Sequence, residues 1–200
     1  DVICGRDEFD STSADHAPPE CSRELEKPVE ALVLGVPRQA YSAANHKGVL
    51  AAMERAIGIY TKLGARIVEV DLPHIEHGIA AYYIVAPAEA SSNLARFDGI
   101  RYGRRANLAA GEGLMELYCK SRGEGFGPEV QRRIMLGTYV LSAGYYDAYY
   151  TTALKVRRKI KSDYDAAFSE SGGGCHALLM PSSPGPAFTI GSKTSDPLAM

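Results

Sequence analysis

No stretch of the sequence approaches the roughly 18 consecutive apolar residues that a membrane-spanning helix needs. Neither basic nor acidic residues are in clear excess, because the sequence has 22 basic and 24 acidic residues and a formal net charge of −2. Such a chain has no overall attraction to nucleic acid or to anionic lipid, so binding of either would need a local patch. We therefore expect a soluble, globular protein that has no membrane partner.

Cysteine is scarce, and its spacing matches neither a zinc site nor a redox motif, since no C-x-x-C pair occurs. We interpret all four thiols as reduced groups of a cytosolic protein: Cys4, Cys21, Cys119 and Cys175. His74 and His77 are three residues apart and could face the same side of a helix. Two ligands do not make a metal site, however, and Glu76 would point elsewhere. We expect no bound metal.

The hydrophobic content of 46% in 200 residues is enough for one domain or most of one. Residues 31–37 form a short apolar run typical of a buried strand, and residues 66–72 have the pattern of a second strand. Between them, residues 48–63 repeat apolar side chains at helical spacing. A strand, a helix and a strand at this spacing predict a parallel βαβ unit, and therefore an α/β fold. Residues 1–30 have the composition of a surface excursion.

The second half of the chain is mainly helical by pattern. A helix is expected after the second strand, with Pro87 kinking or interrupting it. A longer helical region is predicted from Pro128 to about Phe168, with Gly137 and Gly144 as breaks or close-packing points. Residues 177–181 have the pattern of a further buried strand.

One stretch, residues 82–103, runs from tyrosines and small apolar residues directly into crowded polar groups. Its second half carries Arg96, Asp98 and Arg101, followed closely by Arg104 and Arg105. The stretch either lines a cleft, where charges meet a ligand, or is a helix that ends in a salt-bridged loop. Ser91 and Ser92 lie within it without a Gly-rich turn, so we expect these hydroxyls to pin a helix end rather than to act as nucleophiles.

Three stretches together resemble one known family. They are AEASSNLARFDGIRYG at 88–103, GFGPEVQRRIMLGTYVLSAGYYDAYY at 125–150 and PSSPGPAFTIGSKTSDPLAM at 181–200. The chain is similar in these segments to the amidase signature family, and within it to the A subunits of tRNA-dependent amidotransferases. The resemblance implies a mixed β-sheet covered by helices on both faces. The family's catalytic lysine and Gly/Ser-rich segment match nothing here, so we expect residues 1–200 to be a partial amidase domain, truncated at both ends.

The resemblance also assigns residues. An arginine of the family's E-V-x-R-R-I motif binds the α-carboxylate of glutamine, and by position this role falls to Arg133, with Arg132 as the neighbouring alternative. A tyrosine just before the serines lines the same pocket, and Tyr82 matches it best, with Tyr83 beside it. No residue of this chain is expected to be catalytic, and the chain alone is expected to be inactive.

The function implied by the resemblance is that of a glutamine-hydrolysing subunit. It releases ammonia from glutamine for the ATP-dependent conversion of Glu-tRNA(Gln) to Gln-tRNA(Gln), a glutaminyl-tRNA synthase activity located in the cytoplasm. The implied partners are subunits B and C of a heterotrimer, with charged tRNA bound by the complex. ATP and magnesium are used by that complex, and no cofactor is bound by this chain.

Two alternatives remain open. The first is a stand-alone amidase of the same family. The second is a non-catalytic module that binds anions or RNA through residues 96–105 and the basic run at 155–161. That run could equally be a solvated helix face, with its charge balanced by Asp163 and Asp165.

Overall fold

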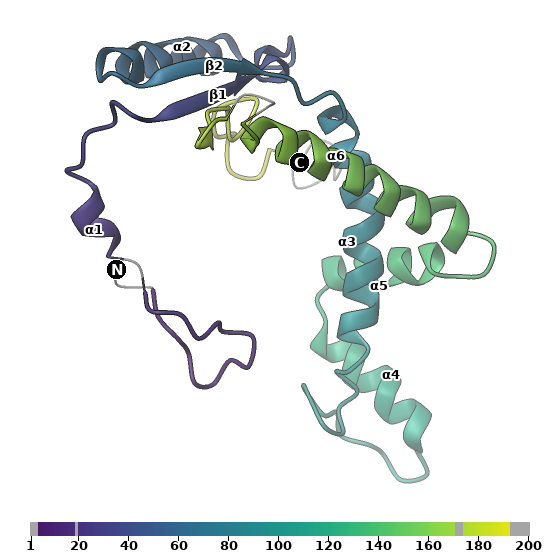
Figure 1. Cartoon of the computed structure of the whole chain (residues 1–200). Coiled ribbons are helices and arrows are strands. Elements are labelled where there is room, and N and C mark those ends of the chain that lie inside the picture. The colour runs from purple at the N-terminus through teal and green to yellow at the C-terminus, as the bar shows by residue number, and fades with distance from the viewer. Residues whose placement is uncertain (1–3, 19, 171–173, 193–200) are drawn as a thin grey trace. The chain divides into compact units, whose positions relative to one another are not determined.

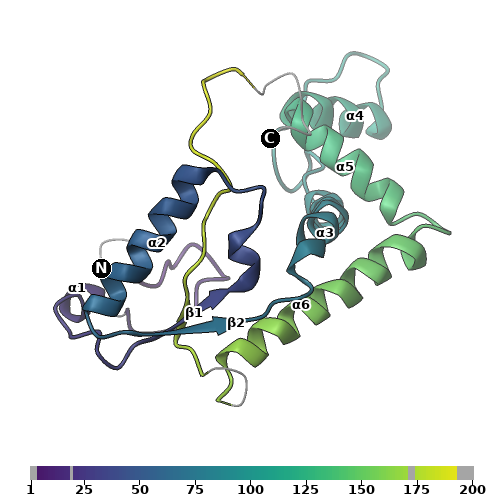
Figure 2. The ribbon, with the colours of Figure 1, turned by 90° about the horizontal axis from the view of Figure 1, so that it is seen from above.

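The computed structural model describes residues 4–18, 20–170 and 174–192. The chain divides into two compact units: residues 1–70 with 173–200, called the sheet unit, and residues 71–172, called the helical unit. Figures 1 and 2 show the ribbon from two directions. Residues 4–18 and 20–32 contain turns and the single-turn helix α1 (Cys21–Glu24), and most of their side chains are exposed. The domain limits inferred from the sequence stay predictions.

The sheet unit is built on three parallel strands in the order β2-β1-β3. The central strand β1 (Val33–Pro37) is buried at all five positions, as its continuous apolar run predicts, and β2 (Arg66–Val70) pairs with it along its whole length. The predicted βαβ unit is therefore confirmed, and with it the α/β class. Every described strand pair is parallel, so the antiparallel pairing of a mixed sheet and a helix layer on its second face stay predictions.

The third strand is much shorter than expected. β3 comprises Ala177–Leu178, whereas the sequence predicted a strand to residue 181. Backbone hydrogen bonds from His176 N–H and Leu179 N–H to β1 carbonyls flank it. Pro181 then follows, and because proline has no N–H it cannot extend the ladder.

Helix α2 (Lys47–Lys62) lies along the sheet and supplies the core of this unit (Figure 1). The imidazole Nδ1 of His46 accepts a hydrogen bond from the N–H of Gly48 at 3.1 Å and so caps the helix start. Met53 packs with Val36 of β1 and with Ala40 of the 3₁₀ turn η1 (Arg38–Tyr41). The helix predicted at residues 48–63 is confirmed within one residue at each end.

The helical unit begins with the 3₁₀ turn η2 (Ile75–His77) and continues into helix α3 (Gly78–Leu94). The later elements are α4 (Leu114–Gly125), α5 (Pro128–Val140), the π-helix η3 (Tyr146–Thr151) and α6 (Thr152–Phe168). Helix α3 packs against both α5 and α6. Pro128 opens α5 as predicted, and Gly144, with a φ of 86°, lies in the predicted break between helices.

Pro87 does not interrupt α3, so that part of the prediction is wrong. The residue is buried in the middle of a continuous helix, and its carbonyl faces Gly137 of α5. A Cβ atom added at Gly137 would lie 2.0 Å from the Pro87 oxygen. The backbones of α3 and α5 thus touch at this point, which makes Gly137 the close-packing point that the sequence allowed as one alternative.

In the described ranges no disulfide joins the four cysteines, and Cys175 is buried beside Gly35 of β1. Across those same ranges, none of the helices combines the length and the apolar character that crossing a bilayer requires.

Candidate functional site

The two residues expected to bind substrate contact each other, although 51 positions separate them in the chain. Arg133 projects from α5 and donates a hydrogen bond from Nη1 to the hydroxyl oxygen of Tyr82 on α3, at 3.0 Å. The next contacts between these helices follow in the same order, from Pro87 with Gly137 to Ser91 with Thr138. Packing of α3 on α5 therefore brings the pair together.

Glu129 is the third member of this cluster, and reasoning from the sequence missed it. Its Oε1 accepts a hydrogen bond from Arg133 Nε at 2.8 Å, and its Oε2 is in contact with Arg132. Glu129 is the second residue of α5, where the positive end of the helix dipole favours a carboxylate. The spacing of an acid three and four residues before two arginines could have revealed it.

Hydrogen bonds hold this cluster in its charged form. The contact with Arg133, helped by the charge of Arg132, keeps the pKa of the Glu129 carboxyl below its ordinary value. The contacts with Tyr82 and then Glu129 raise the pKa of the Arg133 guanidinium above its already high value. One carboxylate and two guanidinium groups carry a net charge of +1, so the cluster can accept one anionic group.

Tyr83 lies beside Tyr82 but does not take its place. The two rings meet edge to face with centroids 5.3 Å apart, and both residues are about half exposed, at 50% and 51%. The Arg133 guanidinium is hydrogen-bonded to the hydroxyl of Tyr82, while Arg132 pairs only with Glu129 among its described contacts. The geometry thus selects Tyr82 and Arg133 from each pair as contact partners; their role in binding a substrate stays a prediction.

A second polar contact connects α3 with the π-helix η3. The hydroxyl of Tyr150 donates to Glu89 Oε1 at 2.6 Å, and this hydrogen bond to a carboxylate raises the pKa of the Tyr150 phenol. Tyr139 and Tyr145 pack their rings at 4.3 Å across the break that precedes η3. The sequence shows these tyrosines, but helical spacing alone did not predict which of them contacts an acid.

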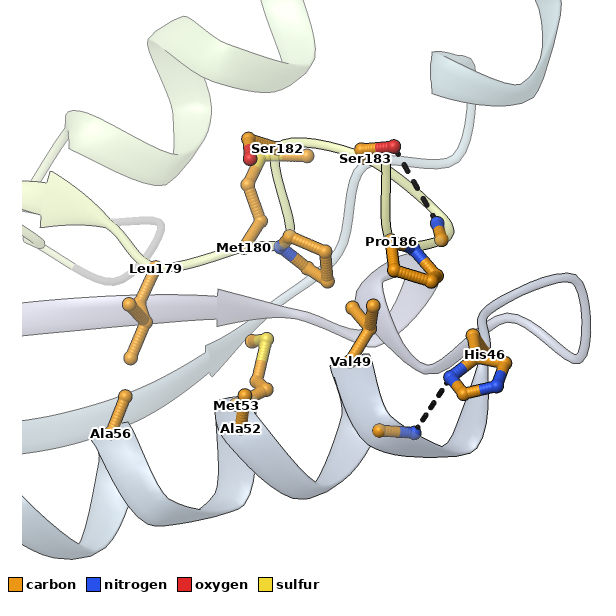
Figure 3. A pocket seen from close by; sticks show the side chains of 13 residues that line it. His46, Val49, Ala52, Met53, Ala56, Leu179, Met180, Ser182, Ser183 and Pro186 are labelled. Atoms are coloured by element: carbon orange, nitrogen blue, oxygen red, sulfur yellow. Dashed lines mark hydrogen bonds between the residues drawn. The ribbon is translucent and has the colours of Figure 1, made fainter. Parts of the chain in front are cut away.

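The sheet unit contains a separate pocket of about 530 Å³ between α2 and residues 179–186 (Figure 3). Its walls are mainly apolar, with Val49, Met53 and Leu179 among them, and His46 lies at one end. His46 Nδ1 already accepts from Gly48 N–H, and among the described residues no carboxylate or lysine lines the pocket. The Nδ1 of His46 is therefore engaged in capping α2 and is not available as a base for a serine.

Comparison with known proteins identifies the family of this chain. The family model described as Amidase matches residues 1–200. The chain belongs to the amidase family. A crystal structure of the A subunit of glutamyl-tRNA(Gln) amidotransferase from Thermotoga maritima matches 98% of this amidase chain with a TM-score of 0.62 and 36% identity. A crystal structure of an amidase matches 84% of it with a TM-score of 0.56 and 23% identity, which supports the fold alone.

Curated relatives of this amidase chain are more similar still. The A subunit of glutamyl-tRNA(Gln) amidotransferase from Methylacidiphilum infernorum is 54% identical, and the one from Koribacter versatilis is 51% identical, each over the whole chain. The chain spans about 40% of the length of these relatives and 36% of the Thermotoga structure.

Ser91 of the amidase chain serves a structural contact. Thr138 Oγ1 donates to the Ile134 carbonyl at 2.8 Å, so its 3.0 Å contact with Ser91 Oγ requires the serine as donor. Ser91 therefore pins α3 to α5, as the sequence predicted. A serine whose proton is held by threonine lacks the base that a nucleophile needs.

Residues 96–105 form a salt-bridged loop, which is one of the two arrangements that the sequence allowed. Arg104 binds Glu124 through Nε at 3.1 Å and Nη2 at 2.8 Å. Asp98 accepts hydrogen bonds from the N–H groups of Ile100 and Arg101, and these lower the pKa of its carboxyl. The carboxylate thereby fixes the turn that follows α3.

Asp163 does not balance the basic run of α6, which corrects the expectation from the sequence. Its carboxylate accepts from the backbone N–H of His74 at 2.8 Å and from His74 Nδ1 at 3.0 Å, and its side chain is only 9% exposed. Asp165 alone provides the expected balance, by pairing with Lys161. The His74 ring is thus engaged by a carboxylate that fastens the start of the helical unit to α6.

This buried contact predicts a pH-dependent stability. Burial by itself would raise the pKa of Asp163, but hydrogen bonds from His74 outweigh it and bring the pKa below its ordinary value of 3.8. A lowered pKa contributes stability above pH 3.8, and that contribution disappears as the pH falls through the folded-state pKa. Asp163→Ala should therefore lower the free energy of unfolding by about 1–3 kcal/mol near neutral pH, and by less below about pH 3.5.

Urea denaturation of both proteins at several pH values measures this difference. Asp165→Ala is the matched control, because its exposed pair with Lys161 should contribute less than about 0.5 kcal/mol. An Asp163→Ala effect that equals the control, or that stays constant down to about pH 3, would show that the charge of Asp163 contributes nothing.

Proposed function

We propose that this amidase chain forms part of a glutamine-hydrolysing A subunit of a tRNA-dependent amidotransferase. The observation that carries the proposal is the Arg133–Tyr82 contact, because it presents a guanidinium beside an aromatic ring in a chain similar to such subunits. A guanidinium offers parallel N–H donors that match a carboxylate. Arg133 binds the α-carboxylate of glutamine, and Tyr82 lines the same pocket.

In this proposal, the side-chain amide of glutamine is attacked by a serine that belongs to another part of the complete protein. Ammonia leaves, an acyl-enzyme forms, and water then releases glutamate. Subunits B and C of the heterotrimer use the ammonia to convert Glu-tRNA(Gln) to Gln-tRNA(Gln) in the cytoplasm, at the expense of ATP and with magnesium. ATP and magnesium are used by the whole complex, and this chain itself binds no cofactor.

The chain of residues 1–200 alone should release no ammonia from glutamine. Its candidate serine, Ser91, is hydrogen-bonded to Thr138 and has no base in contact among the described residues. Ammonia release by the purified chain should equal the buffer blank, while the complete subunit with its partners is active. Activity of the chain that disappears in Ser91→Ala or Ser92→Ala would contradict this and make these serines catalytic.

Anion or RNA binding is the second candidate, and one surface favours it. Lys155, Arg157, Arg158 and Lys161 line a groove of about 670 Å³ along α6, in which Asp165 pairs with Lys161 but Asp163 neutralises none of the four. Binding of a single-stranded RNA by the chain, with an affinity that falls steeply as salt rises, would support this candidate. A stand-alone amidase would instead hydrolyse amides without subunits B and C.

A further inference from the structure

We infer that Glu129 is a positioning residue, which orients the guanidinium of Arg133 toward the carboxylate of the substrate. This inference rests on the proposed function, because it concerns how the same site recognises its ligand. Glu129 itself does not touch the substrate, since a carboxylate would repel another one. It acts through Arg133.

The contacts of Arg133 fix the plane of its guanidinium. An arginine side chain is long and flexible, but here Nε donates to Glu129 at 2.8 Å and Nη1 donates to Tyr82 at 3.0 Å. Two contacts at different nitrogens of a rigid, planar group leave it little freedom to rotate. The guanidinium has five N–H donors, and within the described ranges the other donors of Nη1 and Nη2 have no further contact. They are left for a two-pronged contact with a carboxylate.

Arg132 keeps Glu129 from covering those donors. It contacts Oε2 of the carboxylate, while Arg133 Nε contacts Oε1, so each oxygen is engaged by a different arginine. All three residues lie on α5, within four positions of one another, and their arrangement is set by one helix. The cluster therefore carries a net charge of +1, and the orientation of the Arg133 guanidinium is fixed. A single carboxylate, such as that of an amino acid, fits it.

Loss of this orientation should appear in substrate binding. Ordering one long side chain costs about 2- to 12-fold in affinity when it must occur during binding. We expect Glu129→Ala in the complete subunit to raise KM for glutamine by that factor while kcat changes little, because the α-carboxylate is remote from the amide that is cleaved. Glu129→Gln should recover most of the loss, because its amide oxygen can still accept from Arg133 Nε.

A double-mutant cycle separates positioning from a general effect on folding. If Glu129 acts through Arg133, Glu129→Ala should have no further effect on KM in an Arg133→Ala background. Glutamine in which the α-carboxylate is replaced by a carboxamide should be insensitive to Glu129→Ala. Glu116→Ala is the matched control, since Glu116 also lies in the first turn of a helix, α4, but accepts only from Gly113 N–H among its described contacts. It should leave KM unchanged.

Steady-state ammonia release from glutamine by wild type, the single variants and the double variant provides the readout. An unchanged KM in Glu129→Ala, or an equal increase in the Arg133→Ala background, would overturn the positioning role while the proposed function stands. If wild type releases no ammonia from glutamine, or if Arg133→Ala binds glutamine like wild type, the proposed function fails first, and the inference falls with it.

Discussion

Arg133→Ala should lower kcat/KM for glutamine by about 10- to 150-fold in the complete subunit, because a hydrogen bond between charged partners contributes about 1.5–3 kcal/mol. Most of the loss should appear in KM. The α-carboxylate is bound about equally in the ground state and in the transition state, so its contact adds uniform binding rather than acceleration of the chemical step. Kinetics of ammonia release over a range of glutamine concentrations measure both constants.

Two further variants define what Arg133 contributes. Arg133→Lys should recover little, because an ammonium group is a point charge that can neither replace the paired N–H donors nor reach Glu129 and Tyr82 together. Arg132→Ala should have a much smaller effect, since among its described contacts Arg132 pairs only with Glu129. A strong effect of Arg132→Ala with none from Arg133→Ala would move the carboxylate site to Arg132. Wild-type kinetics in both variants would place it elsewhere.

Gly137→Ala is expected to destabilise the helical unit by about 3 kcal/mol or more, the upper end of overpacking effects. The added Cβ would lie 2.0 Å from the carbonyl oxygen of Pro87 and 2.6 Å from Ser91 Cβ. Rotation of a side chain cannot relieve a collision with backbone, so the two helices would have to move apart. That movement would also lengthen the contact between Arg133 and Tyr82.

Glycine to alanine at another helical position should change the stability of the protein in the opposite direction. Gly58 lies within α2, and a Cβ added there would meet nothing within 4 Å. Gly58→Ala should therefore stabilise the protein by about 0.5–1 kcal/mol through its higher helix propensity. Thermal melting of the two variants beside wild type gives both signs in one experiment. A melting temperature of Gly137→Ala at or above that of wild type would show that α3 and α5 do not touch there.

The sequence predicted the elements whose apolar pattern is strong. The continuous apolar run at residues 31–37 and the helical repeat at 48–63 each fit a single type of element, so the βαβ unit follows from the sequence, and the structure has β1 at Val33–Pro37 and α2 at Lys47–Lys62. The extent of β3 could not be predicted in the same way, because its end depends on hydrogen bonds to β1 and on the following proline. The continuation of α3 through Pro87 could not either, because burial against Gly137 overrides the local preference.

The candidate site was predictable only in part. Resemblance to a family pointed to Arg133 and Tyr82, but their mutual contact depends on how two helices pack. Glu129 was missed because an acid near a helix start is common and usually serves the helix alone. Asp163 was misassigned for a related reason: its position on a basic helix suggested a surface charge, whereas packing turns it toward His74.

The contact of Pro87 with Gly137 also bears on how stiff the site is. Helices that pack through side chains can shift when residues change, but two backbones in van der Waals contact cannot move closer together. Tyr82 lies five residues before Pro87 on α3, and Arg133 lies four residues before Gly137 on α5. Little more than one turn of helix on each side therefore sets the distance between Tyr82 and Arg133. Mutations on the outer faces of α3 and α5 should leave this distance unchanged.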